Sequence, residues 1–241
     1  MRYFRSTIAI LSLVLLLSAC GGGKKPVSTQ PPLAGSGSQT IESFASIEAR
    51  AKKGEADAEF DLGAFYHDGE NGTQKDFKLA RQWFEKAAAQ GEPRAQFNLG
   101  VMYYIGEGVK QDYAQAKNWF DKSAKTGNAR AEFNLGVMYY RGEGMKQDYS
   151  QALQLFTMAG LQNFGEAQFN IGVMYAKAEG VKQDIGKAYS WFSLALDNGN
   201  PRAEEVMKNI ERELSPDQLK VVKKMADDLK KQLLSQTAGK L

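Results

Sequence analysis

Residues 95–127 read AQFNLGVMYYIGEGVKQDYAQAKNWFDKSAKTG, and this stretch returns along the chain every 36 residues. An internal repeat of this length indicates one supersecondary unit that is stacked against copies of itself. The first copy has one extra residue, in the loop that runs from Asp68 to Gly72. Three series carry the register: Ala95, Ala131, Ala167 and Ala203; Asp76, Asp112, Asp148 and Asp184; Ala80, Ala116, Ala152 and Ala188.

Each copy reads as two helices, A and B, joined by a glycine loop. Helix A is expected to end at a glycine such as Gly106, which accepts a left-handed conformation, and helix B to begin at the recurring aspartate, which can cap its first turn. A glycine inside helix A, such as Gly100, costs about 1 kcal/mol relative to alanine. We therefore expect another helix to approach closely there. Trp119 and Phe120 of helix B are predicted to lie in the core.

These motifs are Leu-Gly-x-x-Tyr, then Gly-x-Gly-Val-x-x-Asp, then Ala-x-x-Trp-Phe and a closing glycine. Together they resemble the Sel1-like repeat, a relative of the tetratricopeptide repeat, over about residues 58–199. The resemblance implies an all-α fold, a right-handed α-solenoid of antiparallel helix pairs, and a family that serves mainly as scaffolds and adaptors for other proteins. Two positions depart from the pattern: Ala178 replaces a loop glycine and Leu155 replaces a tryptophan.

The repeat pattern also divides the chain into parts. Because repeats bury their faces only against neighbours, the two ends of the array need capping helices. The last of these helices is expected to begin at the capping box Ser215-Pro216-Asp217-Gln218. The predicted parts are an N-terminal capping helix in 41–57, four repeats in 58–200 (58–94, 95–130, 131–166 and 167–202), and C-terminal capping helices in 201–241.

The N-terminus has the three-part layout of an export signal, with Arg2 and Arg5 before an apolar run. That run would form a helix of roughly 15 Å, about half of the ~30 Å hydrocarbon core. The tetrad ending in Cys20 resembles the bacterial lipobox, which implies cleavage before a lipidated, palmitate-bearing cysteine. An ordinary signal peptide with a stray cysteine is the open alternative. We expect a signal peptide in 1–19, followed by the lipidated cysteine and a flexible tether in 20–40. Because Gly21 follows the cysteine, we expect an outer-membrane lipoprotein of the cell envelope that faces the periplasm.

Composition excludes several functions. The chain has 31 basic and 28 acidic side chains, so it has little net field with which to gather nucleic-acid phosphates. We therefore expect no nucleic-acid partner. A single cysteine excludes an intramolecular disulfide and a thiolate metal cluster, and a single histidine without a Gly-x-Ser-x-Gly motif gives no support for a Ser-His-Asp triad, so we expect no metal, cofactor or catalysis. His67 is expected at the surface. An enzyme or ligand-binding protein acting on cell-wall or β-lactam-like molecules remains the alternative.

Helix A carries more apolar side chains than one core face needs. Phe97, Val101 and Tyr104, at i, i+4 and i+7, form a second stripe beside the core stripe. In tetratricopeptide-like superhelices the equivalent face lines a concave groove, so the stripe resembles a site for a peptide or helix of an envelope or surface protein. The predicted groove comprises Phe60, Arg94, Phe97, Val101, Tyr104, Arg130, Phe133, Val137, Tyr140, Phe169 and Val173.

A binding role for this groove requires large side chains that are only partly buried in the free protein, namely Phe97, Tyr104, Phe133 and Tyr140. The equally open interpretation is that these side chains pack between neighbouring repeats. With the groove, the sequence predicts a non-catalytic protein-protein interaction scaffold or adaptor in the bacterial cell envelope.

Overall fold

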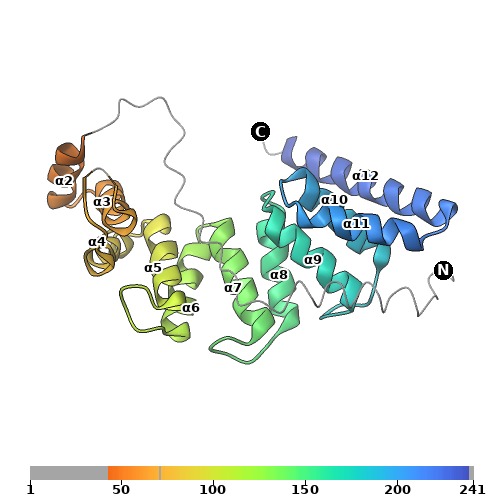
Figure 1. The fold of residues 1–241 in the computed structure, drawn as a ribbon, viewed down its shortest axis with the longest axis horizontal. Helices are drawn as coiled ribbons and strands as arrows, with labels where there is room; N and C mark the ends of the chain where they lie inside the picture. The colour runs from red at the N-terminus through yellow and green to blue at the C-terminus, as the bar shows by residue number, and fades with distance from the viewer. Residues whose placement is uncertain (1–42, 71, 239–241) are drawn as a thin grey trace. The chain divides into compact units, whose positions relative to one another are not determined.

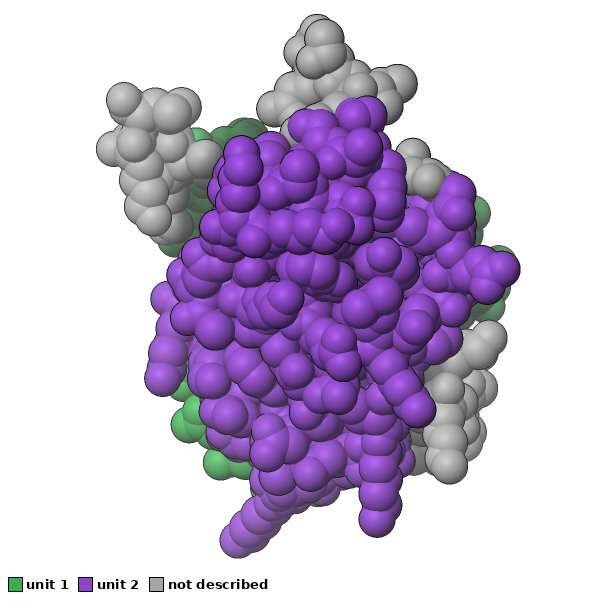
Figure 2. All heavy atoms as spheres, turned by 90° about the vertical axis from the view of Figure 1, so that its left-hand side faces the viewer, with its two compact units in different colours: residues 1–25, 147–241 green, residues 26–146 purple. Residues whose placement is uncertain are grey.

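The computed structural model describes residues 43–70 and 72–238, and every regular element in those residues is a helix (Figure 1). The predicted signal peptide, Cys20 and the tether lie outside the described residues. The helices belong to two compact units, unit 2 (described residues 43–70 and 72–146) and unit 1 (described residues 147–238), which are coloured separately in Figure 2.

Within each unit, successive helices of the repeats pack against each other as the repeat pattern predicts, and the last two helices of unit 1 both pack against the final B helix. The A helices are α3, α5, α7 and α9, and the B helices are α4, α6, α8 and α10. Unit 2 contains α2 (Phe44–Lys52), α3 (Ala56–Asp68), α4 (Phe77–Ala89), α5 (Pro93–Ile105), α6 (Tyr113–Ala124) and α7 (Ala129–Arg141). Unit 1 contains α8 (Tyr149–Gly160), α9 (Gly165–Lys177), α10 (Ile185–Asp197), α11 (Arg202–Glu213) and α12 (Pro216–Ala238). The prediction of an all-α, solenoid-class fold is confirmed.

Local sequence signals set the helix ends. The Asp112 carboxylate accepts hydrogen bonds from the backbone N–H groups of Ala114 and Gln115 at 2.9 and 3.0 Å. Three further aspartates cap their B helices in the same way, namely Asp76, Asp148 and Asp184. Gly106 ends α5 with φ at +80°, whereas α9 ends at Ala178 with φ at +60°, a strained value for a residue with a Cβ atom. The predicted caps are therefore confirmed.

The interior glycines of helix A admit the phenylalanines of helix B. A Cβ atom added to Gly100 would lie 2.5 Å from Cδ1 of Phe120, and one added to Gly172 would lie 2.7 Å from Cδ1 of Phe192. Both phenylalanines are completely buried. The close approach expected from the glycine positions is confirmed.

The tryptophans of helix B differ from the prediction, because they are half-buried rather than core residues. Trp119 packs against a core cluster that contains Ala88 of the preceding repeat and Ala95 and Leu99 of its own repeat. The Nζ atom of Lys122 lies 4.0 Å from the centroid of the tryptophan ring. The ring is thus at the edge of the interface between repeats, with a lysine over it.

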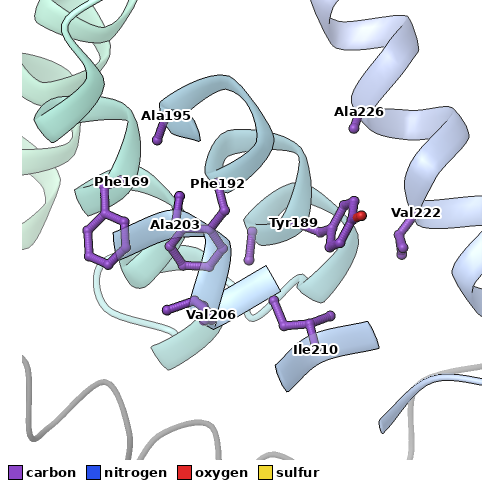
Figure 3. Close-up of a cluster of buried hydrophobic side chains, with 11 residues drawn as sticks. Phe169, Tyr189, Phe192, Ala195, Ala203, Val206, Ile210, Val222 and Ala226 are labelled. Atoms are coloured by element: carbon purple, nitrogen blue, oxygen red, sulfur yellow. The ribbon is translucent and has the colours of Figure 1, made fainter. Parts of the chain in front are cut away.

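Unit 1 continues beyond the last repeat into α11 and α12. Phe169 and Phe192 of the repeat share one core cluster with Val206 of α11 and Val222 of α12 (Figure 3). At the start of α12, the Ser215 and Gln218 backbone N–H groups each donate to the other residue's side chain, at 3.0 and 3.3 Å respectively. This is the reciprocal capping box that the sequence predicts.

Candidate functional site

Most side chains of the predicted groove are buried. Phe97, Tyr104 and Phe133 are only 5%, 8% and 5% exposed, so the expectation that these three rings are partly buried is wrong. The other buried members of the predicted groove are Phe60, Val101, Val137 and Phe169. The half-buried members are Arg94, Arg130, Tyr140 and Val173.

Two of these phenylalanines, Phe60 and Phe169, have an arginine from the helix that follows their repeat packed over the ring. The Phe60 ring packs against Phe84 of its own repeat, with 5.7 Å between centroids, and the Arg94 guanidinium carbon lies 4.2 Å from the Phe60 centroid. In unit 1, Arg202 lies at 4.3 Å over Phe169 in the same way. The second apolar stripe therefore packs between repeats, which supports the alternative interpretation of these rings.

Tyr104 and His67 occupy equivalent places at the end of helix A, and both contact the loop of the following repeat. The Tyr104 hydroxyl donates to the carboxylate of Glu143. Burial raises the pKa of Tyr104, and Glu143 raises it further. His67 Nε2 lies 3.0 Å from a carboxylate oxygen of Glu107, and the ring is half-buried rather than at the surface. These contacts connect neighbouring repeats.

A buried polar residue near the start of helix A joins the repeat to the end of the preceding B helix. Gln96 Nε2 donates to the Ala88 carbonyl at 3.3 Å, and Gln168 Nε2 donates to the Gly160 carbonyl at 2.8 Å. The side-chain oxygen of Gln168 accepts from Asn198 at 3.0 Å. The side-chain N–H groups of both glutamines and the side-chain oxygen of Gln168 therefore have structural partners, whereas the side-chain oxygen of Gln96 has none among the described residues.

One accessible face remains on the two A helices α3 and α5. Each of the two helices contributes one residue per turn to this face. Ile105, at the end of α5, is 45% exposed. We call it the α3/α5 face, and its accessible residues are Asp57, Asp61, Ala64, Arg94, Asn98 and Ile105. Val101, which is in register with Ala64, is buried.

Two polar side chains on this face have no hydrogen bond or ion pair to any described residue. They are the carboxylate of Asp61 and the amide of Asn98, and both residues are half-buried. Asn170 has the equivalent place on α9 in unit 1 and is also half-buried without such a partner among the described residues. None of these side chains is among the buried polar atoms without a partner, so solvent reaches them and they are available to hydrogen-bond with a partner molecule.

Charge around Asp61 is mixed, with Arg50 and Arg94 on one side of the balance and Asp57 and Glu92 on the other. Arg50 contacts the carboxylates of Glu55 and Asp57, each at 2.6 Å. Arg94 contacts Glu92 at 2.7 Å. Burial raises the pKa of the Asp61 carboxyl above its ordinary value; among the nearby charges Arg94 lowers it and Asp57 raises it. When Asp61 itself and Glu55, which is paired with Arg50, are included, this region has four carboxylates and two guanidinium groups.

Asp61 and Asn98 were not among the predicted groove residues. Each lies one turn after a residue at the start of helix A, and the third and fourth repeats have Asn134 and Asn170 in register. This recurrence of a polar residue was the available signal. In the sequence, a recurring polar residue of this kind cannot be told apart from an ordinary solvated helix face. The structure adds that Asp61 and Asn98 make no hydrogen bond with the described residues.

The family model of the Sel1 repeat matches residues 56–92, 93–128, 129–164 and 165–200. The chain therefore belongs to the Sel1 repeat family. Each matched repeat begins two residues before the predicted one, at the point where the A helices begin.

Two solved structures share this fold. A protective antigen present in uropathogenic Escherichia coli strains, which displays an SLR fold, is 40% identical with a TM-score of 0.64; the match covers 66% of this chain and 34% of the antigen. This chain thus spans about a third of that relative. A Sel1 repeat protein from Oxalobacter formigenes is 32% identical with a TM-score of 0.61, over 64% of this chain and 63% of that one. The comparison with curated proteins gave no match.

A metal centre and a membrane-spanning helix would be other kinds of site in residues 43–70 and 72–238. In these residues, no group of three or more histidine, cysteine, aspartate and glutamate side chains is arranged to hold a metal ion. No helix in the same residues has both the length and the apolar character that crossing a bilayer requires.

Proposed function

We propose that this protein is a non-catalytic interaction scaffold that holds a segment of a partner protein against the α3/α5 face. Sel1 repeat proteins are typically interaction scaffolds, which gives the class of function. The observation that carries the proposal for this chain is the pair of half-buried polar side chains, Asp61 and Asn98, that have no partner among the described residues. A partner that supplies hydrogen bonds there would satisfy both.

The binding face therefore differs from the groove predicted from the sequence. Phe97 and Tyr104 are buried and therefore are not part of the binding surface. Its accessible side chains are the polar ones, such as Asp61 and Asn98, together with Ile105. Arg94 belongs to both sets. Ile105 is the strongest apolar candidate for contact with a partner because nearly half of its surface is exposed.

The proposal includes a location in the cell envelope. The sequence around Cys20 supports a lipid anchor, and a lipidated protein with the tether in 20–40 would present the repeats at a membrane surface. We propose the outer membrane, with the repeats in the periplasm and an envelope protein as partner.

Site-specific photo-crosslinking in living cells tests the binding face. A photoreactive amino acid replaces Ile105 in one variant and Asn118, an exposed residue of α6, in a control variant. We expect one discrete adduct from position 105 and none of that mass from position 118. The same adduct from both positions, or no adduct from position 105, would contradict the proposed face.

The anchor is tested separately with Cys20→Ser. We expect this variant to lack lipid and to keep residues 1–19, as seen by mass measurement of the protein from fractionated cells. Normal processing of the variant, with release into the same fraction as the parent, would exclude lipidation.

A further inference from the structure

We infer that the partner segment on the α3/α5 face is an extended peptide stretch that places a lysine or arginine side chain against Asp61. This inference rests on the proposed function and specifies the chemistry of the partner. It follows from three features of the face: the unpaired carboxylate, the excess of negative charge around it, and the free amide one helix further along.

The unpaired carboxylate is the first feature. Asp61 is half-buried, and it makes no ion pair or hydrogen bond with the described residues. The two nearby guanidinium groups are already held by other acids, at 2.6 Å in the case of Arg50 and at 2.7 Å in the case of Arg94. A cationic side chain brought by a partner would supply what the chain itself does not.

The charge balance is the second feature. Glu55, Asp57, Asp61 and Glu92 outnumber Arg50 and Arg94, so an acidic partner group would meet net repulsion and a basic one net attraction. Asp61 also replaces the asparagine that the other three repeats have at this place. Its pKa is raised by burial, so the ionised carboxylate costs folding stability that an asparagine would not cost. A residue that is unfavourable for folding is expected where binding uses it.

The free amide is the third feature, and it selects an extended segment. An asparagine side chain both donates and accepts, which matches the C=O and N–H groups of one peptide unit. A helical partner already uses these backbone groups internally, whereas an extended partner leaves them available. Asn98 therefore suits the backbone of an extended segment, and Asp61 suits one of its side chains.

The test uses the full-length protein in detergent and a displayed library of random twelve-residue peptides. We expect the enriched peptides to share a lysine or arginine at a fixed position. A synthetic copy of the strongest peptide is then compared with a version in which methionine replaces that basic residue. The replacement should weaken binding to the parent protein about tenfold, as loss of a charge-assisted hydrogen bond does.

Two variants assign the effect to one carboxylate. With Asp61→Asn, which introduces the residue found in the other repeats, both peptides should bind equally and weakly. Asp228→Asn removes the same charge from an exposed position on α12, and it should behave as the parent does. Thermal unfolding of Asp61→Asn, which should be no lower than that of the parent, checks the fold.

The outcomes separate the two levels of the proposal. Enriched peptides without a basic residue, or unchanged affinity for Asp61→Asn, would overturn the inference and leave the binding face standing. If no peptide is enriched on the parent protein, both the inference and the proposed function are wrong.

Discussion

Replacing Thr126 by glutamine should stabilise the protein, because it would satisfy a buried oxygen that has no hydrogen bond. In the first repeat, Gln90 donates to the buried carboxylate of Glu59 at 2.8 Å, and in the fourth, Asn198 donates to Gln168 at 3.0 Å. Thr126 has the equivalent place in the second repeat, but its hydroxyl donates to the Ser123 carbonyl.

The Gln96 side-chain oxygen consequently has no partner, although the residue is only 7% exposed. An unsatisfied buried acceptor costs roughly 1–3 kcal/mol, and ordering an exposed glutamine side chain costs up to about 2 kcal/mol. A net gain of about 0.5–1 kcal/mol is therefore expected for Thr126→Gln. In urea, with a slope of about 2 kcal/mol per molar, the unfolding midpoint should rise by about 0.3–0.5 M.

Thr126→Glu is the matched control, because glutamate has the same length as glutamine but no N–H group to donate. It should give no gain near neutral pH. If both variants raise the midpoint equally, or if Thr126→Gln leaves it unchanged, then the Gln96 oxygen is not a source of instability and the comparison between repeats is misleading.

Three further predictions concern the core, the end of a helix and the α3/α5 face. Phe120→Ala should lower the free energy of unfolding by about 3–5 kcal/mol, as for buried phenylalanines, and Trp119→Ala by less because Trp119 is half-buried; urea unfolding of both variants checks the order. Ala178→Gly should raise stability by about 0.5–1 kcal/mol by relieving the left-handed conformation, and an unchanged melting temperature would count against that strain. Asp61→Asn should stabilise the protein near pH 7: the raised pKa means that folding favours the protonated carboxyl, so the parent loses stability as the pH rises through that pKa, and the advantage of the variant should shrink toward about pH 4.

The helix pairs could be predicted from the sequence because their signals are local. An aspartate such as Asp112 caps the helix that follows it, and a glycine such as Gly106 ends the helix before it. These effects involve residues a few positions apart. The register of 36 residues then extends each local assignment to every repeat.

The accessible face could not be predicted in the same way. The spacing of Phe97, Val101 and Tyr104 shows that they share one side of a helix, but it does not show what covers that side. The cover comes from the following repeat, for example from Glu143 over Tyr104. Periodicity assigns residues to a common face, and only packing decides which faces remain exposed.

The loops between A and B helices also set where the array tolerates a change of length. A Cβ atom on Gly108 would lie 2.7 Å from the Cβ atom of Phe77, and one on Gly144 would lie 2.5 Å from that of Tyr113. Each of these loops thus abuts the first residue of the preceding B helix. The first repeat has no B helix of a preceding Sel1 repeat against its loop, and its loop alone carries an extra residue. An affinity tag or fluorophore is therefore best inserted between Gly69 and Thr73, where no neighbouring repeat dictates the spacing.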